Sequence, residues 1–519
     1  MMQTNSKSLP MLLAGMMADP SRLEDINVLG LTLDSRQVQK GYLFFSLSLN
    51  GNQRTSYLKQ ALTLGASVVL FDVKEQLTEE EILALEHANV SAHQIKNLAE
   101  KVSEIAARFY GHPSMAMTII AVTGTNGKTS VTQFIAQSLE LLAQPCGVIG
   151  TLGTGRVNQL QTTGMTTPDP IRVQAALTEF YQQNIKYVVI EASSHALEQG
   201  RLNSVDIDVA VLTNLSRDHL DYHQDMASYA AAKKRLFDCA TIKTVVINSD
   251  DEFGQQLMTS LLERNNVNLV SYSRRENKIQ NIITLQANAI ETTLDGLAFN
   301  LVYKTEQATI KSPLIGRFNI DNLLAVAGSL LAIAIPFDEV AKVLVQCQSV
   351  DGRMQRYGNK QQPQVVIDFA HTPDALEQAL VSLRTHLSNN GLLWCVFGCG
   401  GDRDTGKRPL MGSIAELNAD RIVLTDDNPR SEIPAVIVQD ILSGIKDLSK
   451  AYVEHNRKLA ITYAISQSKS KDIILIAGKG HEQYQEVLGV KHPFNDASVV
   501  KEVLLAANDA HQLLQGAES

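Results

Sequence analysis

The sequence predicts an α/β protein of three domains, and its length, its alternating segments and its helix-ending residues lead to this prediction. A chain of 519 residues is too long for a single hydrophobic core. Runs rich in Val and Ile alternate with helical segments, which is typical of parallel sheets covered by helices on both faces. Gly and Pro near residue 112 and a polar stretch near residue 349 mark boundaries. We therefore expect domains at 1–112, 113–348 and 349–519.

The composition excludes several classes of protein. An apolar share of 44% and a charged share of 19% are ordinary for a globular chain. The net charge of -9, with no long basic block, argues against a nucleic-acid partner. Five scattered cysteines lack metal-ligand spacing and indicate reduced thiols. Because neither a signal peptide nor an 18-residue apolar run is present, we expect a cytoplasmic protein without a membrane partner.

The first domain is expected to mix short strands and helices. Residues 41–49 ("GYLFFSLSL") and 66–73 ("ASVVLFDV") have the continuous apolar pattern of buried strands. Residues 98–114 have the spacing of an amphipathic helix that ends at Gly and Pro.

The second domain begins with a phosphate-binding pattern. The segment "VTGTNGKTS", residues 122–130, follows the expected strand "MTIIAVTG" and opens the helix "SVTQFIAQSLELLAQ". Backbone N–H groups at such a helix start bind anions, and glycine lets the chain approach the phosphates. Val122 occupies the first glycine position of the usual motif, so a shortened form remains. The expected nucleotide contacts are Gly124, Thr125, Asn126, Gly127, Lys128, Thr129 and Ser130, with Lys128 on the β and γ phosphates and the Thr129 hydroxyl on Mg²⁺.

Acidic and histidine side chains follow the next strands of this domain. Glu191 ends the expected strand "KYVVIEA" beside the phosphate loop, where it is a plausible second Mg²⁺ ligand. The segment that contains "SRDHLDYH" begins at a strand's carboxyl end, which favours a contact of His219 with metal or substrate. His223 is expected to be a solvated loop residue, and Lys233 and Lys234, taken alone, to lie on a solvated helix face.

The third domain repeats the α/β pattern, with polar residues after its strands. The strands "QVVIDFAH", "GLLWCVFGCG", "ADRIVLTDD" and "KDIILIAGKG" each end in Gly, Asp or His, where ligands of open α/β sheets bind. The glycine-rich turn at 398–409 is not a dinucleotide fingerprint, because Arg403 occupies the third glycine position, so NAD is not expected. The segment "VLTDDNPRSE" places two acids and Arg430 after a strand, which in isolation would be a charged surface turn.

In this order, the motifs closely resemble those of the Mur ligase family, over almost the whole chain. They are "TGTNGKTS", "EASSHAL", "TNLSRDHLDYH", "GRFNIDN", "GRMQ", "DFAHTPDAL", "GCGGDRDTGKRP", "TDDNPR" and "GKGHE". The resemblance implies cytoplasmic, ATP-dependent synthesis of the peptidoglycan stem peptide. It also implies that the first domain binds UDP, the central P-loop domain binds ATP, and the Rossmann-like third domain binds the incoming amino acid.

The resemblance also implies roles for individual residues. Catalysis would involve Lys128, His219 and Lys233, with Lys233 carbamylated and Mg²⁺ held by Thr129, Glu191, His219 and Lys233. Asn322 and Asp368 would lie near ATP. The UDP-muramoyl-dipeptide contacts would be Leu33, Ser35, Asn50, Asn52, Thr166, Thr167, Ser193, Gln199 and Arg201.

Within the family, "DNPR" is typical of the enzymes that add meso-diaminopimelate. The distal centre of this amino acid carries a carboxylate, which an Arg430 guanidinium can bind with two parallel hydrogen bonds. Glu482 can accept from the distal ammonium, and Arg403 supplies a second cation. The expected contacts are Arg403, Asp427, Asn428, Pro429, Arg430, Gly478 and Glu482. The expected substrates are therefore UDP-N-acetylmuramoyl-L-Ala-D-Glu, meso-diaminopimelate and ATP, bound by a monomer.

Other activities remain as alternatives. A D-Ala-D-Ala-adding enzyme or a folylpolyglutamate synthase would share the phosphate loop, but the "DDNPR" and "GKGHE" pair argues against both. A third alternative is a lysine-adding enzyme, and Arg430 argues against it because lysine-adding members of the family lack this arginine. A nucleotide-dependent switch or motor is disfavoured because motifs lie at the ends of strands in both the second and the third domain.

Overall fold

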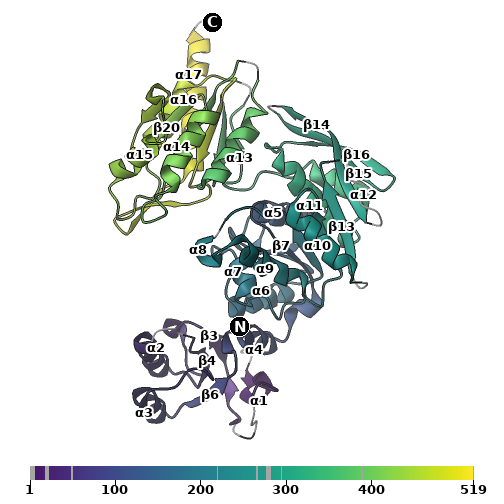
Figure 1. The fold of residues 1–519 in the computed structure, drawn as a ribbon, viewed down its shortest axis with the longest axis vertical. Coiled ribbons are helices and arrows are strands. Elements are labelled where there is room, and N and C mark those ends of the chain that lie inside the picture. The colour runs from purple at the N-terminus through teal and green to yellow at the C-terminus, as the bar shows by residue number, and fades with distance from the viewer. Residues whose placement is uncertain are drawn as a thin grey trace. The chain divides into compact units, whose positions relative to one another are not determined.

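The computed structural model of the protein (Figure 1) describes residues 6–17, 21, 23–47, 51–218, 220–264, 267–275, 282–293, 295–359, 361–388 and 390–517. The chain divides into two compact units, Met1–Ser271 and Tyr272–Ser519. Both are built from sheets rich in parallel strands with helices packed on them, which confirms the α/β class. The domain boundaries expected at 112/113 and 348/349 remain predictions. No helix in the described ranges is long and apolar enough to cross a membrane.

The first unit opens with a parallel sheet in the order β3-β4-β5-β6. Side chains alternate across the pleat, so Leu43 and Phe45 enter one core and Phe44 enters the other. Helices α1 and α4 cover the first face, and α2 and α3 cover the second (Figure 1). The elements are β1 Lys7–Ser8, α1 Leu9–Leu12, β2 Asn27–Val28, β3 Gly30–Thr32, β4 Tyr42–Phe45, α2 Gly51–Thr63, β5 Val68–Asp72, α3 Glu79–Ala88, β6 Ser91–Ile95 and α4 Leu98–Tyr110.

A buried ion pair joins α2 to α3 in this sheet's outer layer. Arg54 donates from Nε and Nη2 to the two oxygens of Glu81, at 2.9 and 2.7 Å. Glu81 also caps its own helix through Thr78 and is fully buried. Burial raises the pKa of Glu81, but the bonds from Arg54 and Thr78 outweigh it and lower the pKa from 4.5 to about 2.

Replacing Glu81 with Gln should therefore destabilise the protein in a pH-dependent way. At pH 7 the variant removes the buried carboxylate that Arg54 pairs with and leaves Arg54 only the partly exposed Glu75, 3.2 Å from its Nη1, which costs about 1–3 kcal/mol. Because the native carboxyl has the lower pKa, its stabilisation is present above pH 4.5 and is lost as pH falls towards about 2. Urea midpoints of both proteins should differ clearly at pH 7 and less at pH 3. An equal difference at both pH values would contradict this account.

In the central sheet of the first unit, β13 is followed by strands in the order β12-β11-β7-β10-β8-β9, which are parallel except for β9. In register, Thr123 of β7 pairs with Leu212 of β11, and Val122 pairs with Glu191 of β10. The carboxyl ends of these three strands therefore meet at one edge. The elements are β7 Thr118–Thr123, α5 Lys128–Leu141, β8 Cys146–Gly150, β9 Gly153–Arg156, α6 Pro170–Gln182, β10 Tyr187–Glu191, α7 Ser194–Glu198, β11 Val209–Leu212, α8 Leu220–His223, α9 Met226–Phe237, β12 Thr244–Asn248, α10 Glu252–Leu262 and β13 Asn268–Ser273.

The second unit begins with an antiparallel meander that the sequence patterns above do not predict. Strands β14 Ile283–Thr293, β15 Gly296–Tyr303 and β16 Glu306–Ser312 pair in turn. In β15, Leu297, Phe299 and Leu301 are buried and alternate with more exposed residues, so one face packs inward. Helices α11 Phe318–Ala332 and α12 Phe337–Leu344 follow, and most residues of α11 are buried.

The second unit ends in a sheet of order β17-β18-β22-β19-β20-β21, parallel except for β17. Separate apolar clusters cover its two faces, as expected for a sheet with helices on both sides. The elements are β17 Gln355–Tyr357, β18 Gln364–Asp368, α13 Pro373–Arg384, β19 Leu393–Phe397, α14 Lys407–Asn418, β20 Arg421–Leu424, α15 Pro434–Leu442, β21 Ala451–Val453, α16 Arg457–Gln467, β22 Ile473–Ala477, β23 Tyr484–Val487, β24 Val490–Pro493 and α17 Asp496–Ala517.

Candidate active site

The phosphate loop joins the carboxyl end of β7 to the start of α5 in the first unit. Gly124 has φ +148°, and a Cβ there would lie 1.8 Å from the Thr213 hydroxyl oxygen, so only glycine fits. Thr213 donates to the Asn126 carbonyl at 2.6 Å, and the Asn126 N–H donates to the Asn214 side chain at 2.9 Å. The segment after β11 therefore holds the loop in shape, a role that the sequence motif did not indicate.

Two lysines converge on this loop. Lys128 Nζ donates to the carbonyls of Gly124 and Thr125 at 2.9 and 2.8 Å, and Lys233 Nζ donates to Gly124 at 2.7 Å. Lys233 is 1% exposed and lies over the Tyr229 ring, 4.3 Å from its centroid. Burial, followed by the charge of Lys128, lowers the pKa of Lys233 well below its usual value. The position expected for Lys233 from its sequence alone, a solvated helix face, is therefore wrong.

Glu191 is fully buried at the end of β10 and faces the start of α5. Its Oε2 accepts from the Thr129 hydroxyl at 2.9 Å, and its Oε1 accepts from the Thr151 N–H at 2.8 Å. A Cβ on Gly150 would lie 2.4 Å from Glu191 Oε1, so this glycine leaves room for the carboxylate. The hydroxyl and carboxylate that were expected near Mg²⁺ are thus in direct contact.

A cavity of about 400 Å³ opens beside the phosphate loop. It brings Lys128 and Lys233 together with four of the nine expected UDP-muramoyl-dipeptide contacts. Its lining is Lys128, Met165, Thr166, Thr167, Ser193, Ser194, His195, Arg201, Tyr229 and Lys233. Arg201 Nη1 donates to the Thr167 carbonyl at 2.6 Å, and its Nη2 donates to Gln199 at 2.7 Å. Burial lowers the pKa of Arg201, so the cavity holds a partly desolvated cation suited to an anionic ligand.

His223, expected at the surface, is instead buried at 4% exposure. Its Nε2 lies 2.9 Å from the Ser194 hydroxyl, and its Nδ1 lies 3.3 Å from Glu198 Oε2. The ring also packs against Tyr229, with centroids 5.1 Å apart. The histidine is buried because it bridges α8 to both ends of α7.

Some expected contacts lie elsewhere. Ser35 is buried and donates to Gln60 at 2.8 Å, and Leu33 packs against the first core, so neither lines the cavity. Asn50 and His219 lie outside the described residues, as does the side chain of Asn52. Asn322 and Asp368 belong to the second unit, where Asn322 donates to Asn319 and Asp368 accepts from the Met354 N–H.

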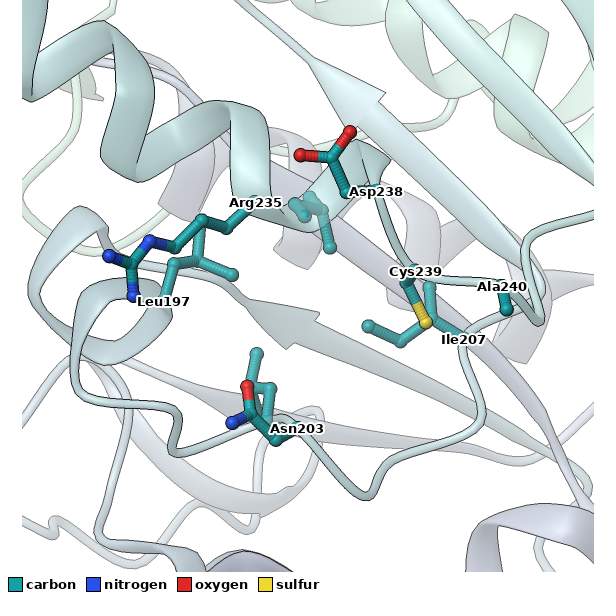
Figure 2. Close-up of a pocket in the computed structure, with 9 residues that line it drawn as sticks. Leu197, Asn203, Ile207, Arg235, Asp238, Cys239 and Ala240 are labelled. Atoms are coloured by element: carbon teal, nitrogen blue, oxygen red, sulfur yellow. The ribbon is translucent and has the colours of Figure 1, made fainter. Parts of the chain in front are cut away.

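A second cavity of the first unit, of about 340 Å³, is different in character (Figure 2). Leu197 and Ile207 give it apolar walls, and Arg235, Asp238 and Cys239 stand at its polar side. None of the expected site residues among those described lines it. We therefore assign neither nucleotide nor muramoyl substrate to this cavity.

In the second unit, three loops at the carboxyl edge of the sheet, which follow β19, β20 and β22, carry the expected amino-acid contacts. Arg430 Nη1 donates to the Gly401 carbonyl at 2.7 Å, and its Nε lies 3.4 Å from Glu486 Oε2. A Cβ on Gly400 would lie 2.9 Å from Arg430 Nη1 and 3.7 Å from Arg403 Cγ, so both arginines flank this glycine. Arg430 has φ +49°, a strained conformation that is uncommon for a residue with a side chain.

Acidic side chains belong to the loops after β20 and β22. Asp427 is buried, which raises its pKa, and a Cβ on Gly478 would lie 2.5 Å from Asp427 Oδ2. Glu482 accepts from Asn428 Nδ2 and from Lys479 Nζ, each at 2.8 Å. Burial raises the pKa of Glu482, but Lys479 and Asn428 outweigh this effect and hold the pKa below its usual value. The structure thus brings Asp427, Asn428, Gly478 and Glu482 together with Lys479, whereas Arg403 is exposed and its Nη1 donates to the Asp402 carbonyl at 3.1 Å.

The residues present fit Mg²⁺ only in part. The Thr129 hydroxyl and the Glu191 carboxylate offer the oxygen ligands that Mg²⁺ prefers. The ammonium of Lys233 does not bind cations, whereas a carbamate on the same nitrogen would. In the described part of the chain, which omits His219, no three His, Cys, Asp or Glu side chains gather into a metal site.

Comparison with known proteins decides the family. The model of the "Mur ligase middle domain" matches residues 122–330, and that of the "Mur ligase, glutamate ligase domain" matches residues 352–480. A UDP-N-acetylmuramoyl-L-alanyl-D-glutamate–2,6-diaminopimelate ligase of Xanthomonas campestris pv. campestris (strain 8004) is 46% identical, over 96% of this chain and 98% of its own. The chain belongs to the Mur ligase family.

Solved structures of Mur ligases agree with this assignment. The structure of a UDP-N-acetylmuramoyl-L-alanyl-D-glutamate–2,6-diaminopimelate ligase is 35% identical in sequence, with a TM-score of 0.71 over 97% of this chain and 99% of that one. MurF from Acinetobacter baumannii is 16% identical, with a TM-score of 0.63 over 96% and 99%, and shows the shared fold alone. The expected three-domain Mur ligase architecture is therefore confirmed.

Proposed function

We propose that this Mur ligase adds meso-2,6-diaminopimelate to the D-Glu γ-carboxylate of UDP-N-acetylmuramoyl-L-Ala-D-Glu, converting ATP to ADP and phosphate. The observation that carries the proposal is the cavity in which phosphate-loop Lys128 and the substrate candidates Thr167, Ser193 and Arg201 share one space. The UDP-linked substrate and diaminopimelate are those for which its relatives are named. We also propose that the enzyme is a monomer and works in the cytoplasm on peptidoglycan precursors.

The chemistry requires activation of the carboxylate. A carboxylate does not react with an amine at neutral pH, because its leaving group is too poor. Transfer of the ATP γ-phosphoryl gives an acyl phosphate, which the diaminopimelate amine attacks with release of phosphate. The phosphate-loop N–H groups and Lys128 would neutralise charge on the phosphoryl oxygens, and Arg201 would hold the substrate carboxylate in line.

The buried Lys233 is suited to carbamylation. A lysine with a lowered pKa is partly a neutral amine, which adds to CO₂ and loses a proton to give a carbamate anion. Such an anion, with Thr129, Glu191 and His219, would hold Mg²⁺, which supplies charge neutralisation at the phosphates. Modification would thereby change the charge at Lys233 from positive to negative.

The decisive measurement is phosphate release from ATP with UDP-N-acetylmuramoyl-L-Ala-D-Glu and either meso-diaminopimelate or L-lysine. We expect release only with diaminopimelate, because L-lysine lacks the distal carboxylate that Arg430 would bind. Equal release with L-lysine would retain a ligase but overturn the amino-acid assignment. Absence of release with both amino acids would overturn the ligase, and would favour a nucleotide-dependent switch.

A further inference from the structure

Lys479, Asn428 and Glu482 form a closed triangle of hydrogen bonds in the second unit. The side chain of Lys479 is completely buried, and its Nζ donates to Asn428 Oδ1 at 2.9 Å and to Glu482 Oε2 at 2.8 Å. Asn428 Nδ2 donates to the same Glu482 Oε2 at 2.8 Å. Each corner of the triangle therefore holds the other two, and the triangle joins the loop after β20 to the loop after β22.

Further bonds leave this triangle little freedom. The N–H of Glu486 donates to Asn428 Oδ1 at 2.9 Å, and the Gln485 side chain donates to the Asp427 carbonyl at 2.8 Å. The hairpin β23–β24 thus closes on the same loop. Behind it, Arg457 and Asp496 form a fully buried ion pair with bonds of 2.7 and 2.8 Å.

The two bonds to Glu482 both fall on Oε2. A buried ammonium requires a compensating anion, and here that anion is one of the expected diaminopimelate contacts. Oε1 is the oxygen of Glu482 that these bonds leave for a ligand ammonium. Lys479 thereby determines both the direction and the ionised state of the carboxylate.

We propose that Lys479 is the positioning residue of the amino-acid site, which fixes Glu482 and Asn428 so that Glu482 Oε1 receives the distal ammonium of diaminopimelate. The inference rests on the proposed function. It assigns Lys479 no direct contact with the substrate. Its effect is expressed through Glu482, so removing Glu482's charge should also remove the need for Lys479.

The test compares Lys479→Met with wild type in phosphate release. We expect KM for meso-diaminopimelate to rise about tenfold or more, while KM for ATP and for the UDP-linked substrate stays within about twofold. A lysine that was only a core-packing residue would change all three constants or only the melting temperature. The matched control is Lys491→Met, since Lys491 Nζ lies 4.1 Å from the centroid of the Tyr484 ring that Lys479 also faces, at 5.7 Å.

A double-mutant cycle identifies the route of the effect. If Lys479 acts through Glu482, Lys479→Met should add less than about twofold to KM for diaminopimelate in a Glu482→Gln background. Full additivity would overturn the proposal, as would an unchanged KM in Lys479→Met. If Lys479→Met does not fold, Lys479→Gln, which keeps a donor without the charge, is judged by the same two criteria. Failure of wild type to use diaminopimelate would instead overturn the proposed function.

Discussion

Replacing Lys128 with alanine should reduce phosphate release by roughly 10²- to 10³-fold or more, which corresponds to about 3–4 kcal/mol of transition-state stabilisation. Lys128 Nζ already lies at the mouth of the loop, within 2.8–2.9 Å of two of its carbonyls. From there its flexible side chain would reach the β and γ phosphates of bound ATP and neutralise charge during phosphoryl transfer. A neutral methyl group cannot replace this charge.

The control for this experiment is Lys234→Ala. Lys234 is an exposed lysine of α9, and its Nζ pairs with Asp238 at 2.9 Å, away from the phosphate loop. Its replacement should leave turnover within about twofold, because an exposed pair contributes little. Lys128→Ala should keep the wild-type melting temperature and its affinity for the UDP-linked substrate. A turnover close to that of wild type would refute the role of this loop in ATP use.

The sequence predicted well those features that depend on local chain geometry. The strand, glycine loop and helix around Lys128 must follow one another to build an anion site, so their pattern is visible in a single stretch. The same holds for Asp427 and Gly478, which follow β20 and β22 at one sheet edge. Register in a parallel sheet then brings together residues that are distant in sequence.

Features that depend on packing between distant segments were not predictable in the same way. His223 looks like a loop histidine in sequence, and only the packing of α8 on α7 shows that it is buried. No role was predicted for Lys479 from the sequence, yet it is completely buried and bonded to Asn428, 51 residues away in the sequence. The meander β14–β16 was likewise missed, because β15 is apolar at most positions and only the structure shows the alternation of buried and more exposed residues along it.

Replacing Arg430 with lysine should raise KM for meso-diaminopimelate roughly 30-fold or more, about 2 kcal/mol, with little change in KM for ATP. The substitution keeps the positive charge and removes the planar pair of donors that matches a carboxylate. Arg430 is held for this task, because its N–H donates to the Glu486 carbonyl at 3.0 Å and its own carbonyl accepts from the Leu488 N–H at 2.7 Å. These backbone bonds fix the direction of the side chain and hold its strained φ of +49°.

Arg421→Lys is the matched control, because Arg421 begins the same strand, β20, that leads to the loop of Arg430. Its guanidinium is exposed and donates to the Asp420 carbonyl at 2.9 Å, so its replacement should not alter KM for diaminopimelate. Comparing Arg430→Lys with Arg430→Ala separates charge from geometry. The first variant removes only the planar pair of donors, whereas the second removes the charge as well. If Arg430→Lys behaves like wild type while Arg430→Ala does not, a single point charge recognises the distal carboxylate. If both variants lose diaminopimelate to a similar extent, the two-bond geometry is what selects this amino acid over L-lysine.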